Sequence, residues 1–118
     1  MIVEAQTEIE RSFWSLPLDN RKVIITHGTA LMLSDLRNRH FLATSKVKHF
    51  ETKYQTSLTY LEEHGLPDNA NYEMHEDYIM WHHWLAVTTD TEDEIASLED
   101  IAMQGVILSE TTYSNAGF

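Results

Sequence analysis

The sequence predicts an all-α protein, a small helical domain of about five helices with no sheet of consequence. Apolar residues recur at steps of three and four along most of the chain, and the alternation typical of a half-buried strand is nowhere sustained. Proline and glycine fall where these periodic stretches end. Because about 100–200 residues is typical of one domain, we expect a single domain over residues 1–108 and a flexible tail over 109–118.

The first two helices are separated by Pro17, because the residue before a proline is disfavoured from helical geometry. The helix before it covers residues 3–16, with an apolar stripe of Ile2, Ala5, Ile9, Phe13 and Leu16. Asp19 or Asn20 caps the helix after it through a side-chain oxygen. That second helix has a broad stripe made of Val23, Ile24, His27, Leu31, Leu33 and Leu36.

The next segment, residues 37–54, is also helical in period, and residues 43–45 are the place for a kink or a cap. One long helix and two shorter ones both fit this pattern. A short helix then starts near Ser57 and ends at Gly65, since a glycine followed by Leu-Pro is a helix stop signal. The polar loop after it, residues 68–71, offers two caps for the following helix.

The most aromatic helix covers residues 72–87. We expect residues 88–90 to break it, because Thr91 and Glu94 then form a capping box that starts a last helix. That last helix runs to about Gln104, and Gly105 ends it. Its apolar residues, predicted to point inward, are Ile95, Leu98, Ile101 and Ala102.

Charge is divided unequally along the chain. The 118 residues have a net charge of −11, yet all eight Lys and Arg lie between Arg11 and Lys53. Residues 1–53 therefore form a mildly basic part, with eight cations against six acids. Residues 54–118 contain the other thirteen acids and no Lys or Arg, so that residues 54–108 form a strongly acidic part.

Composition disfavours several classes of function. The absence of cysteine removes disulfide scaffolds, thiolate zinc sites and cysteine nucleophiles, and fits a reducing cytoplasm. No apolar run approaches the roughly 20 residues that span a bilayer, and the start of the chain lacks the features of a signal peptide. The acidity disfavours anionic partners, both nucleic acids and membranes. No phosphate-cradling glycine loop or nucleophile elbow occurs. We therefore expect a cytoplasmic protein that is not an enzyme and needs no cofactor.

A metal site is the first chemistry to consider, because three histidines lie close together in the aromatic helix: His75, His82 and His83. Chelating pairs on a helix need separations of three or four residues. His75 and His82 are seven apart, about 10 Å along the axis at 1.5 Å per residue. The spacing therefore favours solvated charges around aromatic packing, and we predict no metal.

Binding residues are a better interpretation of the same helix. Its apolar positions cover more than half of its circumference, which is typical of a helix that is central in its domain or covered by a partner. Interfaces are enriched in Trp, Tyr and Met and have charged rims. The predicted partner-binding residues are Glu73, Glu76, Asp77, Tyr78, Trp81 and Trp84.

The basic run, residues 37–53, is interleaved with aromatic residues and so has some likeness to a nucleic-acid surface. A solvated helix face, or an internal dock for the acidic second half, is the stronger interpretation. Contact with nucleic acid is expected at most weakly, and only through this run.

Three stretches in order resemble a family of small helical bacterial proteins described as antitoxin-like. They are Phe-Glu-Thr-Lys-Tyr at 50–54, Gly-Leu-Pro at 65–67 and His-Glu-Asp-Tyr-x-x-Trp at 75–81. The resemblance covers about residues 47–85, a third of the chain. Gln55 stands where the family pattern has glycine after the tyrosine. The resemblance implies a non-enzymatic partner of a small RNase-like toxin encoded nearby in a toxin–antitoxin system.

One function is favoured by the sequence, and alternatives to it stay open. The favoured function is an antitoxin-like inhibitor that binds a basic, RNase-like toxin through its acidic aromatic helix, with opposite charge speeding association and aromatic anchors supplying affinity. The alternative is a nucleic-acid mimic with regularly spaced carboxylates across residues 62–100, or a homo-oligomeric structural or regulatory protein that buries its apolar helix against its own copy.

Overall fold

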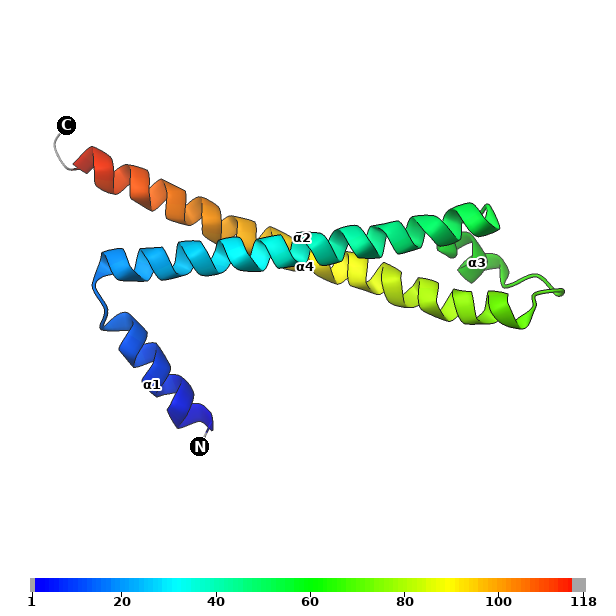
Figure 1. Ribbon diagram of the computed structural model, residues 1–118, viewed down its shortest axis with the longest axis horizontal. Coiled ribbons are helices and arrows are strands. Elements are labelled where there is room, and N and C mark those ends of the chain that lie inside the picture. The colour runs from blue at the N-terminus through cyan, green and yellow to red at the C-terminus, as the bar shows by residue number, and fades with distance from the viewer. Residues whose placement is uncertain (1, 116–118) are drawn as a thin grey trace. The chain divides into compact units, whose positions relative to one another are not determined.

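The described residues form four α-helices, and the prediction of an all-α fold is confirmed. The computed structural model describes the backbone of residues 2–115 and the side chains of residues 8–104, and no strand occurs in the described backbone. The helices are α1 (Ile2–Trp14), α2 (Leu18–Tyr54), α3 (Leu58–His64) and α4 (Tyr72–Asn115), as Figure 1 shows. They divide into two compact units, one of residues 1–33 and 97–118 and the other of residues 34–96.

The long helix α2 resolves the alternatives at residues 43–45 in favour of one uninterrupted helix. Thr44 and Ser45 both donate their hydroxyls to the carbonyl oxygen of Phe41, at 3.0 and 2.8 Å. Short polar side chains that bond back to their own helix in this way are tolerated inside it. The pair therefore neither caps nor breaks α2.

Helix α4 corrects two boundary predictions. The expected break at residues 88–90 and the capping box at Thr91 are wrong, since α4 continues through both. Thr88 and Thr91 instead donate their hydroxyls to the carbonyls of Trp84 and Val87, at 2.9 and 2.7 Å, and so satisfy themselves within the helix. The backbone of α4 also continues past Gly105 to Asn115, while residues 116–118 of the predicted tail lie outside the described residues.

The caps of α3 and of the start of α4 agree with the sequence. The hydroxyl of Ser57 accepts the backbone N–H of Tyr60 at 3.1 Å and starts α3, and Gly65, at a φ of 77°, ends it. Asn71 caps α4 by accepting the N–H of Met74 at 2.9 Å. One strained residue precedes α3: Gln55 has a φ of 54°, in the left-handed region that glycine occupies most easily.

In the unit of residues 34–96, the second part of α2 and the first part of α4 run antiparallel. His40 pairs with Glu92 while Lys53, further along α2, pairs with Asp77, earlier on α4. Most of the covered positions follow steps of three and four, the spacing of a coiled-coil seam. The positions that follow these steps are Leu36, His40, Ala43, Val47, Phe50 and Tyr54 on α2, and Met74, Asp77, Trp81, Trp84, Thr88, Thr91 and Ile95 on α4.

The core of this unit lies at the end of the seam where α3 joins it, and Figure 1 shows α3 beside the end of α2. Phe50, Leu58, Leu61 and Trp81 form one buried cluster. The rings of Phe50 and Trp81 stack with centroids 5.8 Å apart. Burying a large aromatic side chain contributes roughly 1.5–3 kcal/mol, so this cluster is the main apolar contribution to the unit.

In the other unit, the buried face of α2 differs from the apolar stripe predicted for this helix. On this part of α2, Thr29 and Leu33 are buried. Four members of the predicted stripe are exposed instead, namely Val23, Ile24, His27 and Leu31. The seam positions continue the three-and-four spacing back from Leu36, and that spacing selects a narrower face than the broad stripe predicted from apolar residues alone.

Candidate functional site

Trp81, one of the predicted binding residues, lies in the core. Its side chain is 1% exposed and stacks between Phe50 and Tyr54, with ring centroids 5.8 and 6.2 Å away. Trp84, one turn further on, is half-buried and packs against the same cluster. These two indoles hold α4 against α2 and α3, and little of their surface is left for a partner.

Glu73 and Asp77 form an ion-pair network with the end of α2. Lys53 donates to Glu73 at 2.6 Å and to Asp77 at 2.7 Å, and the Tyr54 hydroxyl donates to the same Asp77 oxygen at 2.5 Å. This network realises the predicted internal dock between basic and acidic halves. Lys53 and Asp77 are 24 positions apart in sequence, so their ion pair connects α2 to α4.

The network shifts the pKa values of Lys53, Tyr54 and Asp77. The hydrogen bonds to Asp77 and Glu73 raise the pKa of Lys53. Burial and the hydrogen bond to Asp77 raise the pKa of Tyr54. Burial alone opposes ionisation of Asp77, but the hydrogen bonds from Lys53 and Tyr54 outweigh it and lower the pKa of this carboxyl. Lysine and tyrosine therefore keep their protons at neutral pH, which suits a structural clamp and not a general base.

Tyr78 and Glu76 occupy different surroundings. Tyr78 is half-buried against the aromatic cluster, and its ring meets that of His82 edge-on with centroids 4.7 Å apart. Glu76 is exposed. Of the six predicted binding residues, the structure thus brings Asp77, Tyr78, Trp81 and Trp84 to the inner side of α4. Glu73 is exposed at the edge of that side, where it pairs with Lys53, and Glu76 lies on the outer side.

The exposed surface of α4 also carries apolar residues that were not predicted as contacts from the sequence. Within the unit of residues 34–96, the exposed large apolar side chains of α4 are Tyr72, Ile79, Met80 and Leu85. Glu76, Asp90 and Glu94 are exposed on the same helix. The seven-residue step from Tyr72 to Ile79 is the sequence feature that could have identified these two residues as exposed. It places both of them away from the inward positions, which follow steps of three and four.

The histidines of α4 are dispersed. Nε2 of His82 lies 3.2 Å from Glu62 of α3, while His83 meets the ring of Trp84 edge-on. His75 is exposed. Among residues 8–104, whose side chains are described, no group of three His, Asp or Glu is placed to hold a metal ion.

Some residues of the basic run, residues 37–53, contact the acidic half of the chain, and others form an exposed helix face. Lys53 and His40 face α4, His40 through a 3.1 Å contact with Glu92. Arg39, Lys46 and Lys48 are exposed. The run is therefore partly an internal dock and partly a solvated face.

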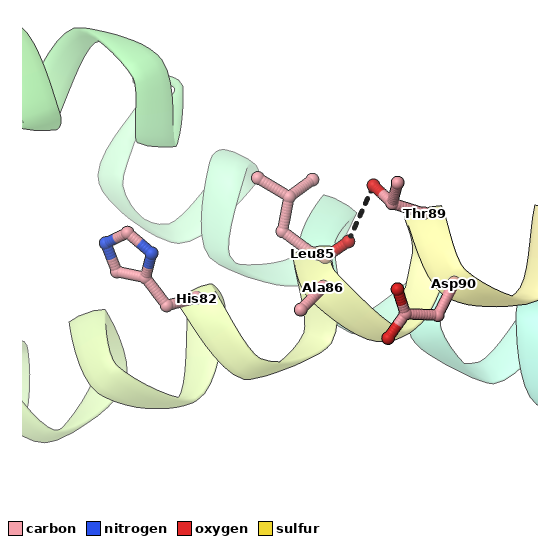
Figure 2. A pocket seen from close by; sticks show the side chains of 5 residues that line it. All are labelled: His82, Leu85, Ala86, Thr89 and Asp90. Atoms are coloured by element: carbon pink, nitrogen blue, oxygen red, sulfur yellow. Dashed lines mark hydrogen bonds between the residues drawn. The ribbon is translucent and has the colours of Figure 1, made fainter.

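A shallow groove of about 370 Å³ lies on α4. Figure 2 shows the five side chains that line it, with His82 at one end and Asp90 at the other: His82, Leu85, Ala86, Thr89 and Asp90. Leu85 is 37% exposed. Thr89 donates its hydroxyl to the Leu85 carbonyl at 3.3 Å, so this donor is already satisfied.

Comparisons with models of protein families, with curated proteins and with solved structures found no match. Within the described part of the chain, no helix combines the length and the apolar character needed to cross a membrane. What the structure defines is an all-α protein in which an acidic helix packs its aromatic side inward and shows carboxylates and apolar side chains outward.

Proposed function

We propose that this protein is an antitoxin-like interaction module that acts by binding and not by catalysis. Its partner is a small basic protein, an RNase-like toxin as the resemblance of residues 47–85 implies, and it acts in the bacterial cytoplasm. The observation that carries this proposal is the outer side of α4. There, exposed Tyr72, Ile79 and Met80 lie among exposed carboxylates, on a stretch of 65 residues without a Lys or Arg.

Opposite charge on such a surface steers a basic partner and raises the association rate, while apolar anchors supply affinity. The buried position of Trp81 moves the anchoring role from the two tryptophans to the exposed apolar residues. Glu76 is exposed, and the proposal assigns it a contact at the rim of this surface.

The spacing of the carboxylates favours this proposal over a nucleic-acid mimic. Between Asp77 and Asp90 the chain has no acid, a gap of about 20 Å along a helix at 1.5 Å per residue. Double-stranded DNA carries one charge per about 1.7 Å of axis. A mimic needs charges at short intervals, whereas this gap is filled with apolar, aromatic and histidine side chains.

The test is co-expression with the product of the adjacent gene, followed by purification through a tag on one protein. We expect a complex that weakens as salt rises, and that is weakened further by Glu76→Lys. The matched control is Glu51→Lys, the same charge change at an exposed position of α2. Failure of the wild-type proteins to form a complex, or equal effects of the two substitutions, contradicts the proposal.

A second candidate, self-association, is favoured by one observation in the other unit. Ile24 and Leu31 are seven residues apart on α2 and both exposed, Leu31 by 73%, and Ile25 and Met32 repeat the same step. Contiguous apolar surface of this kind marks interaction sites. Sedimentation at two salt concentrations tests it: a dimer that persists at high salt and is lost in Leu31→Lys supports this face as a contact between copies, and a monomer at all concentrations excludes it.

A further inference from the structure

The groove on α4 directly follows the part of this helix that α3 covers. Leu58 and Leu61 of α3 pack in the cluster around Trp81, and Glu62 of α3 reaches His82. Leu85, Ala86 and Thr89 lie three, four and seven residues after His82, which places them on the same side of α4, one and two turns further along. The groove therefore continues the surface that α3 occupies.

The chemistry of the groove suits an apolar side chain with a cation beside it. Ala86 leaves room above the helix, and Leu85 supplies an apolar wall. The Thr89 hydroxyl is bonded to its own helix, so covering it leaves no unsatisfied donor. Asp90 stands at one end as an exposed carboxylate.

We propose that this groove seats a basic amphipathic helix of the partner protein, in line with α3. The proposal rests on the proposed function and adds where the partner binds and what it presents. From His82 to Asp90 the groove is about 12 Å long at 1.5 Å per residue. That length matches two turns of a helix, which presents apolar side chains at i and i+4 to a groove and cations at its flanks.

The charge around an apolar groove determines which kind of partner can bind there. Nucleic acids and anionic membranes gain no cationic contact from α4, because the helix that lines the groove contains no Lys or Arg. A basic helix gains from Asp90, and from Glu94 one turn further on. A second copy of this chain is the competing occupant, and the experiment separates the two.

The experiment is a titration of the full-length, ¹⁵N-labelled protein followed by NMR. The probe is a 14-residue amidated peptide with leucine on one helical face and lysine on the other. Two control peptides replace all lysines by glutamate or all leucines by serine. We expect saturable shifts of amide signals within residues 82–90 with the probe alone.

The variants are Ala86→Lys and Ala30→Lys. Both alanines are exposed on a helix, and Ala30 lies on α2 in the other unit. We expect Ala86→Lys to weaken binding of the probe at least about tenfold, and Ala30→Lys to leave it within about twofold, because only the first lysine meets the cationic helix. The same ratio is expected for the product of the adjacent gene.

Three results overturn the proposal. Shifts confined to residues 72–80 place the helix elsewhere on α4. Shifts in residues 82–90 that follow protein concentration without peptide assign the groove to a second copy. An unchanged complex between Ala86→Lys and the product of the adjacent gene refutes the groove while leaving the proposed function in place, whereas no complex with the wild-type protein refutes the proposed function itself.

Discussion

The seam between α2 and α4 in residues 34–96 has two regions of different composition. Near α3 it is aromatic, with Phe50 and Trp81 stacked and Tyr54 beside them. Further along it is small and polar, with Ala43 at 0% exposure and Thr91 buried. Both regions contain almost fully covered residues. The aromatic region removes more apolar surface from water, and burial stabilises in proportion to that surface.

The difference shows how α4 can stabilise the fold through one side and leave its other side open to the proposed partner. The aromatic region supplies the stability of the unit, while the small residues let α2 and α4 pack closely with little side-chain volume between them. The candidate groove on α4 begins where α3 ends, at the junction of the two regions. The exposed surface is thus free to be acidic, because the fold does not depend on it.

The largest expected effect is that of Trp81→Ala. Removing this fully buried ring from the aromatic region lowers the free energy of unfolding by about 3–5 kcal/mol, measured by urea denaturation. The control is Tyr72→Ala, at a tyrosine that is 79% exposed on the same helix, for which a change within about 0.5 kcal/mol is expected. Equal losses in the two variants contradict the assignment of stability to the buried ring.

Ala43→Leu tests the small region by overfilling it. Since the Ala43 methyl is fully covered, a larger side chain forces the helices apart and costs about 1–3 kcal/mol. Ala86→Leu adds the same atoms on the exposed side of α4 and is expected to change stability by no more than about 0.5 kcal/mol. A neutral Ala43→Leu shows that the helices are not closely packed there.

Asp77→Asn tests the ion-pair network at the aromatic region. Its side chain is 20% exposed, so the loss of charge-assisted bonds from Lys53 and Tyr54 costs about 1–2 kcal/mol at neutral pH. The pKa of Asp77 is lowered in the folded state. Its contribution is therefore present above the pKa of the unfolded chain, about 3.9, and is lost as pH falls through the lower folded value.

The basic members of the network act at the other end of the pH range. The pKa values of Lys53 and Tyr54 are raised. Their contributions are present below the unfolded values of about 10.4 and 10 and are lost as pH rises through the folded ones. Chemical denaturation from pH 2 to 11 covers both ends: the acid loss of stability is expected to be smaller in Asp77→Asn, and an unchanged acid limb argues against this network.

The smallest effect is expected for Thr91→Val. The threonine hydroxyl is buried but donates to the Val87 carbonyl, which also belongs to the helix ladder. Replacing it by a methyl of similar shape removes a polar group that makes no contact between helices, so stability stays within about 1 kcal/mol or rises. A loss above about 2 kcal/mol in thermal or urea unfolding reveals a polar contact across the seam.

Much of the fold follows from local signals in the sequence. Pro17, Ser57, Gly65 and Asn71 place the helix ends because each acts through its own backbone or cap. The wrong predictions of a helix break and a cap concern threonine residues. At residues 88–91 the hydroxyls suggest a cap, but the tertiary contact with α2 keeps the segment helical and turns them back onto α4.

The candidate site was predicted less well than the fold. Periodicity identified α4 as amphipathic and aromatic, but a helix that is apolar over most of its circumference does not reveal which aromatic residues face inward. The three-and-four seam settles this, and it is hidden in the sequence because Asp77, Thr88 and Thr91 occupy seam positions. Only Glu76 among the predicted binding residues lies fully outward.

The most direct test of the central claim separates the two sides of α4 in one measurement. The affinity of the product of the adjacent gene is measured by titration calorimetry for wild type, for Glu76→Lys/Asp90→Lys and for Trp81→Phe. Reversal of two exposed charges is expected to weaken binding by on the order of tenfold or more, about 1.4 kcal/mol, while the buried aromatic exchange leaves affinity within about twofold. Binding that depends on Trp81 and ignores the two charges contradicts the account.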